Sequence, residues 1–61
     1  MKKFRGMEVM QSEERKILCY NKDDMGNKYK IYCKSEETNS FYYYNSFKTY
    51  GEAKQYFDKI Y

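Results

Sequence analysis

The sequence predicts an α+β domain, in which an antiparallel meander of three or four strands packs one C-terminal helix on one face. Two observations support this fold class. Short segments rich in aromatic and β-branched residues alternate with turn-forming residues, and residues 49–61 repeat apolar side chains at helical spacing. The chain has 61 residues. Residues 1–61 are therefore expected to form a single small domain with a marginal core.

Four segments are expected to form strands. They are FRGMEVMQ (residues 4–11), RKILCYN (15–21), KYKIYCK (28–34) and FYYYN (41–45). The third of these alternates strictly between polar and apolar side chains, which is typical of a half-buried strand. The expected turns are SEER, KDDMGN and SEETNS, and Gly26 and Asn27 are suited to positive φ in the second of them.

The C-terminal helix has the clearest pattern in the chain. Thr49 is expected to cap its N-terminus, and Glu52 follows three residues later, as in a capping box. The apolar stripe of this helix consists of Ala53, Tyr56, Phe57 and Ile60. This stripe is expected to pack against the sheet.

The alternation of side chains predicts which strand residues the helix covers. A single helix covers one face, and the expected covered residues are Ile17, Cys19, Ile31, Cys33, Phe41 and Tyr43, joined by Met7 or Val9. This choice predicts a hairpin register in which Cys19 lies opposite Cys33 and Tyr20 lies opposite Tyr32. A slip of one residue would mix the faces. In this register a Cys19–Cys33 disulfide is possible, although both cysteines are expected to be reduced and buried.

The opposite face is the candidate partner-binding site. Its expected contact residues are Leu18, Tyr20, Lys28, Lys30, Tyr32, Lys34, Tyr42 and Tyr44, with Lys16 beside them. Aromatic residues make up 21% of the chain and its formal net charge is +3, so this face would be both aromatic and basic. The acidic pairs of the sequence all fall in the expected turns.

Three interpretations of that face stay open. Tyrosine and lysine pairs are common on a solvated antiparallel sheet, where they stabilise cross-strand contacts. The face is also suited to docking on a protein or on a second copy of the chain, because tyrosine is enriched at interface hot spots. Alternatively, bases stack on the rings while lysines contact phosphates, as on other nucleic-acid-binding sheets.

Enzymatic activity and cofactors are not expected. The chain has no histidine, no nucleophile elbow and no phosphate loop. Two cysteines without histidine make a poor zinc site, and the spacing of the acidic pairs does not match a calcium loop. No signal-peptide core and no membrane-spanning stretch are recognised, so a cytoplasmic location is expected.

The segment FYYYNSFKTYGEAKQYFDKI, residues 41–60, resembles the strand–turn–helix ending of small accessory proteins from bacteriophages and mobile elements. The resemblance implies an accessory protein that binds a host protein or protein complex in the bacterial cytoplasm. That group includes inhibitors of bacterial defence systems, such as anti-CRISPR proteins. The combined prediction is a non-enzymatic, protein-binding inhibitor with possible homodimerisation. The alternative is a small nucleic-acid-binding protein that uses the same tyrosine–lysine face.

Overall fold

A computed structural model describes residues 2–60 of the chain. It contains one antiparallel sheet with the strand order β1-β2-β3-β4-β5, followed by one helix. The elements are β1 (Lys3–Phe4), β2 (Met7–Ser12), β3 (Lys16–Tyr20), β4 (Tyr29–Lys34), β5 (Phe41–Phe47) and α1 (Tyr50–Lys59). The predicted α+β meander with a C-terminal helix is confirmed, and the sheet gains a short fifth strand at its N-terminal end.

The segment expected as one strand over residues 4–11 is instead divided between two strands. Arg5 and Gly6 form the turn between β1 and β2, with φ values of 51° and 82°, and Phe4 pairs with Met7 across it. Two successive residues with positive φ are typical of the tight hairpin turn whose twist matches that of the strands. Glycine adopts this conformation without strain, which explains why the chain reverses here.

The register between β3 and β4 differs from the expected one. Leu18 lies opposite Ile31 and Cys19 lies opposite Lys30, so the predicted pairing of Cys19 with Cys33 is wrong. The chain turns earlier than expected, because the side chain of Asn21 accepts a hydrogen bond from the backbone N–H of Asp23 at 3.1 Å. Positive φ occurs only at Arg5, Gly6 and Asn39 among the described residues, so it is also absent from Gly26 and Asn27.

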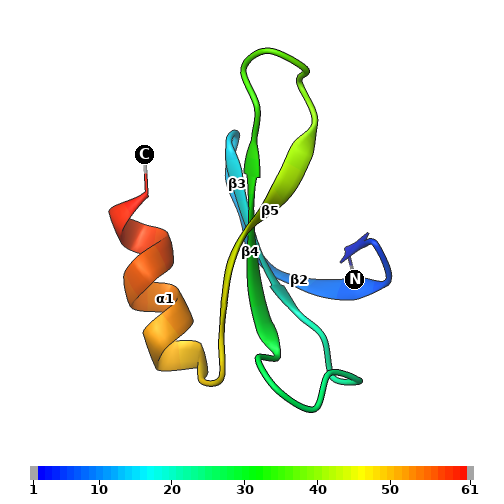
Figure 1. The fold of residues 1–61 in the computed structure, drawn as a ribbon, viewed down its shortest axis with the longest axis vertical. Helices are drawn as coiled ribbons and strands as arrows, with labels where there is room; N and C mark the ends of the chain where they lie inside the picture. Colours follow the sequence, from blue (N-terminus) through cyan, green and yellow to red (C-terminus); the bar gives the residue numbers. More distant parts are fainter. Residues whose placement is uncertain (1, 61) are drawn as a thin grey trace.

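This register buries both faces of the central strands. We call the side under α1 the helix face; its cluster contains Leu18, Ile31, Cys33, Ala53 and Phe57. We call the other side the hairpin face; its cluster contains Met7, Ile17, Cys19 and Tyr32, with Phe4, Val9 and Phe41 packed against it. Figure 1 shows α1 on one side of β3–β5 and the N-terminal segment on the other.

The prediction that Ile17, Cys19 and Phe41 lie beneath the helix is therefore wrong, whereas Ile31 and Cys33 lie there as expected. Tyr43, the remaining residue assigned to the helix side, is 53% exposed. Cys19 pairs with Lys30 instead of Cys33, a shift of three residues, and a shift by an odd number moves every side chain of a strand to the other face. The error in β3 follows from that rule.

The β1–β2 hairpin covers the hairpin face by folding across the sheet as far as β5. The ring of Phe4 lies 5.1 Å from that of Tyr32 and 5.6 Å from that of Phe41, both edge-on. The guanidinium of Arg5 lies 5.2 Å from the Tyr32 ring, and its Nη2 donates to the Phe41 carbonyl at 3.2 Å. The first strand of the sheet thus contacts the beginning of the last one.

The two cysteines lie on different faces and both are free and buried. Cys19 belongs to the hairpin face and Cys33 to the helix face. Their side chains therefore point to opposite sides of the sheet. The disulfide that the predicted register allowed is absent.

The N-terminus of α1 is capped as the sequence predicts. The hydroxyl oxygen of Thr49 accepts from the Glu52 backbone N–H at 3.3 Å and donates to the Glu52 carboxylate at 3.0 Å. Ala53 and Phe57 are fully buried against the sheet, and Tyr56 and Ile60 pack beside them. The helix ends at Lys59, with Ile60 as its C-cap.

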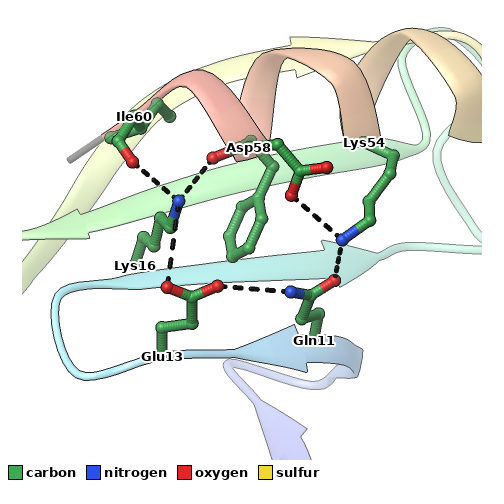
Figure 2. Close-up of polar contacts among 7 residues, drawn as sticks. Gln11, Glu13, Lys16, Lys54, Asp58 and Ile60 are labelled. Carbon is green, nitrogen blue, oxygen red and sulfur yellow. Dashed lines mark hydrogen bonds and ion pairs between the residues drawn. The ribbon is translucent and has the colours of Figure 1, made fainter.

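The C-terminus of α1 is capped by a buried lysine from the sheet. Lys16, only 6% exposed, donates from Nζ to the carbonyls of Phe57 at 2.6 Å and Ile60 at 2.7 Å. These carbonyls belong to the last turn, where a helix leaves acceptors without internal partners and carries its negative pole. The placement of Lys16 on an open face was wrong; Figure 2 shows it beneath the helix end.

A second lysine connects α1 to β2. Lys54 donates from Nζ to the Gln11 side chain and to Asp58, one turn later in the helix. The Gln11 amide donates in turn to Glu13, whose carboxylate lies 3.9 Å from Lys16 Nζ. Figure 2 shows this chain of contacts running from the helix to β2 and back to the helix end. It fixes the position of α1 over the helix face.

Candidate functional site

Strand β5 is an edge of the sheet and presents a group of exposed rings. It pairs with β4 on one side only, so part of its backbone hydrogen-bonding groups faces away from the sheet. Tyr42, Tyr43 and Tyr44 are 48%, 53% and 42% exposed. None of the seven residues of β5 is charged. Lysines usually protect such edges against pairing with other chains, and β5 lacks this protection.

A β-bulge interrupts the pairing of β5 at the third of the three consecutive tyrosines. Ile31 of β4 pairs with Asn45, whereas the next residue, Tyr32, pairs with Tyr43. Tyr44 is therefore the extra residue of β5. Ordinary alternation already places Tyr42 and Tyr44 on one side of β5. The extra residue changes the phase of the strand after Tyr44, so that Asn45 and Phe47 pair with Ile31 and Tyr29.

Tyr42 and Tyr44 point to the helix side, and Tyr43 points to the other side. The Tyr44 ring lies 6.4 Å from the Tyr42 ring and 5.9 Å from the Tyr56 ring of α1. The Tyr43 ring lies 6.0 Å from the ring of Tyr32 on the hairpin face. The three tyrosines thus flank the unpaired edge from both sides.

A groove of about 420 Å³ lies between β5 and the C-terminal part of α1. Its volume is within the range of small-molecule and peptide-side-chain sites. The residues that line it are Arg15, Cys33, Lys34, Tyr42, Tyr44, Tyr56, Lys59 and Ile60. Among residues 2–60, the lining combines three tyrosine rings with three cations and includes no carboxylate.

The cations of the groove differ in their pairing. Arg15 forms an ion pair with Glu36, and the guanidinium holds the pKa of that carboxyl below its ordinary value. Lys34 and Lys59 form no ion pair with any residue in the range 2–60. The positive charge available to a ligand therefore comes from these two lysines.

The reactive groups of the groove are in their neutral forms at neutral pH. Burial raises the pKa of the Cys33 thiol above its ordinary value, which disfavours the nucleophilic thiolate. The side chain of Tyr56 raises the pKa of the Tyr44 hydroxyl. The groove can therefore bind a ligand through rings, hydroxyl donors and ammonium groups, and it offers no activated nucleophile.

The residues predicted to share one open face are dispersed by the fold. Lys34, Tyr42 and Tyr44 line the groove. Leu18 has no exposed surface because α1 covers it, and Tyr32 is 7% exposed beneath the hairpin. The prediction of one continuous aromatic and basic face is wrong.

The other three predicted contact residues lie away from the groove. The Tyr20 ring packs 5.0 Å from the Tyr29 ring. Lys30 forms an ion pair with Asp24 at 2.7 Å. Lys28 precedes β4, and its carbonyl accepts a backbone hydrogen bond from residue 21. These three residues do not form a site with Lys34.

Sequence reasoning missed five residues of the groove: Arg15, Cys33, Tyr56, Lys59 and Ile60. Tyr56 and Ile60 were assigned to the apolar stripe, where they do pack against the core while keeping part of their surface exposed. The available signal was the uncharged run FYYYNSF, which marks β5 as an unprotected edge and so directs attention to its neighbours in α1.

Comparison of the chain with family models, with curated proteins and with solved structures gave no match. Within residues 2–60, His, Cys, Asp and Glu side chains form no group of three that could hold a metal ion. The helix in this range is too short and too polar to cross a membrane. The edge strand and the groove are therefore the features of the described residues that bear on function.

Proposed function

We propose that the protein is a non-enzymatic binding protein that docks on another protein through the β5 edge. The observation that supports this most is the combination, on one edge strand, of three exposed tyrosines and no charged residue. An extended segment of a partner can add to such an edge through main-chain hydrogen bonds, and neighbouring side chains supply specificity. Tyrosine suits this role because it buries a large rigid ring and keeps a polar tip.

The narrower proposal is an inhibitor of a bacterial defence system, encoded by a phage and acting in the host cytoplasm. It depends on the likeness of residues 41–60 to the endings of phage accessory proteins. A reducing cytoplasm agrees with two buried free thiols, Cys19 and Cys33. A second copy of the chain is another partner for the β5 edge, because two edge strands can pair about a two-fold axis.

Nucleic-acid binding is the second candidate, and the groove is the observation that favours it. Three tyrosines lie beside Lys34 and Lys59 there, so a base could stack on a ring while a lysine contacts a phosphate. Salt distinguishes the two functions. Affinity for nucleic acid falls steeply with ionic strength because counterions are released, whereas docking of aromatic residues at a protein edge depends less on salt.

The test is capture of partners from a bacterial lysate by the tagged protein, with and without nuclease, beside light scattering of the pure protein. Tyr43→Lys places a charge on the β5 edge and is expected to abolish capture. Tyr50→Lys is the matched control, because Tyr50 is also an exposed tyrosine, at 42%, but lies in α1. Both variants are first checked for folding by circular dichroism.

Stoichiometric recovery of one protein that survives nuclease and is lost only with Tyr43→Lys supports the proposal. A nuclease-resistant complex that both lysine variants retain would refute docking at β5. Mixed proteins that disappear with nuclease would favour the nucleic-acid function. Self-association that Tyr43→Lys abolishes would identify a second copy as the partner.

A further inference from the structure

We infer that the segment of the partner that docks on β5 is acidic, and that its acidic side chains enter the groove between β5 and α1. This inference rests on the proposed function and names the chemistry of the partner. The groove and the edge are continuous, because Tyr42 and Tyr44 belong to both. A strand added to β5 would direct alternate side chains to the helix side, where the groove lies.

The charges of the groove match an acidic ligand. Lys34 and Lys59 line it without ion-pair partners among residues 2–60. The negative pole of α1 lies nearby. Lys16 offsets this partial negative charge, because its ammonium group donates to the Phe57 and Ile60 carbonyls. A carboxylate in the groove would therefore meet two ammonium groups and tyrosine hydroxyls able to donate hydrogen bonds.

The arrangement of the rings favours a peptide over a nucleic acid. Tyr44 already contacts Tyr42 and Tyr56, at interplanar angles of 56° and 44°, so these rings do not form a parallel slot for a base. Lys34 and Lys59, which form no ion pair among residues 2–60, also give a short positive region, whereas nucleic-acid grooves track a backbone over several phosphates. The outward main-chain groups of β5 match the alternating donors and acceptors of an added strand.

The experiment is a titration of the ¹⁵N-labelled protein with four probes at two salt concentrations, read by amide chemical shifts. Three probes are peptides of about ten residues in which valine alternates with glutamate, glutamine or lysine. The fourth is single-stranded oligothymidylate of similar length. The glutamate peptide is expected to bind roughly threefold to tenfold more tightly than the glutamine peptide at low salt, with shifts in β5 and in Lys34 and Lys59.

Two double variants test whether the preference for the glutamate peptide comes from the lysines of the groove. Lys34→Gln with Lys59→Gln is expected to remove the preference, so that the glutamate and glutamine peptides bind with equal affinity. Lys3→Gln with Lys22→Gln removes the same charge from two exposed lysines outside the groove, and it is expected to keep the preference.

The outcomes separate the inference from the proposed function. Equal binding of the three peptides at β5 would overturn the acidic partner and keep strand addition. A preference for glutamate that survives loss of Lys34 and Lys59 would overturn the groove as its site. Binding of oligothymidylate alone, or of no probe, would overturn both proposals.

Discussion

The helix face and the hairpin face of the central strands are both buried, but different kinds of structure cover them. On the helix face, α1 places Ala53 and Phe57 over Leu18 and Ile31. On the hairpin face, a tight turn brings Phe4 over Tyr32. The comparison shows that, within residues 2–60, neither face of the central strands β3 and β4 is open. The β5 edge is therefore the surface that we propose for binding.

The two covers are also held in place differently. Lys16 and Lys54 tie α1 to the sheet through hydrogen bonds to helix carbonyls and to β2. The hairpin is held mainly by rings and by Arg5, whose guanidinium lies over Tyr32. A small domain needs both covers, because a chain of this length has an expected stability of only about 3–9 kcal/mol.

The largest expected effect on the free energy of unfolding comes from truncating one buried side chain on each face. Leu18→Ala and Ile17→Ala truncate neighbouring residues of β3 that point to the helix face and the hairpin face. Each is expected to lower the free energy of unfolding by about 2–5 kcal/mol, as for other buried leucines and isoleucines. Urea unfolding measures both. A cost below about 1 kcal/mol for Ile17→Ala would show that the hairpin face is open.

Alkaline pH is expected to destabilise the hairpin face more than the helix face. Burial raises the pKa of Cys19 from 9.0 to about 11 in the folded protein. The folded state therefore keeps this proton when the unfolded state has lost it, so stability falls as pH rises from about 9 to about 11. The expected loss is about 2–3 kcal/mol.

The measurement is the pH dependence of unfolding in the wild type, in Cys19→Ala and in Cys33→Ala. The pKa of Cys33 is also raised, but Lys16 opposes the shift, so Cys33→Ala is expected to change the alkaline slope less. The opposite ranking would contradict the assignment of the more buried thiol to the hairpin face.

The next effect concerns the connection of α1 to the helix face. Lys16→Met keeps an unbranched apolar stem but removes the ammonium donor of the Phe57 and Ile60 carbonyls, and the Phe57 carbonyl keeps only the Ile60 N–H. The expected cost is about 1–3 kcal/mol, because two partly buried acceptors lose a charged donor. Lys54→Met is the comparison, and it is expected to cost about 0.2–1 kcal/mol because the Lys54 side chain is 34% exposed. Equal costs, measured by urea unfolding, would refute the special role of Lys16.

The smallest effect is expected at the turn between β3 and β4. Lys30 and the Gly26 N–H lower the pKa of Asp24 below its ordinary value of 3.8. The ionised Asp24 carboxylate therefore stabilises the folded state fully above pH 3.8, and this stabilisation is lost as the pH falls through the lower pKa of the folded protein. Asp24→Asn should flatten the acid limb of the stability curve measured by thermal unfolding. An unchanged acid limb would show that this ion pair does not contribute.

Local patterns in the sequence predict the elements of this fold well. Thr49 and Glu52 mark the start of α1, and the stripe around Phe57 marks its buried side. The sheet faces were harder, because the prediction assumed that one face is open. Residues 16–19 are all buried, and a continuous buried run of this kind is typical of a strand covered on both sides. The run KILC was the signal for that arrangement.

The candidate site was only partly predictable for the same reason. Lys34, Tyr42 and Tyr44 were expected at a binding surface and do line the groove. Their neighbours Tyr56 and Lys59 come from α1, and they meet because Cys33 pairs with Tyr42, which puts Tyr42 and Tyr44 on the helix side. The register between two strands was predicted from an assumed open face, so the sequence pattern could not bring these residues together.

The central claim is that the helix face and the hairpin face are covered separately, and the two cysteines test it directly. The measurement is the rate at which a thiol reagent labels Cys19 and Cys33, resolved by mass spectrometry, in the wild type and in two variants. Phe4→Ala weakens the hairpin cover and is expected to speed labelling of Cys19 alone. Lys16→Met weakens the helix cover and is expected to speed labelling of Cys33 alone. Parallel acceleration of both cysteines in both variants would contradict separate covers.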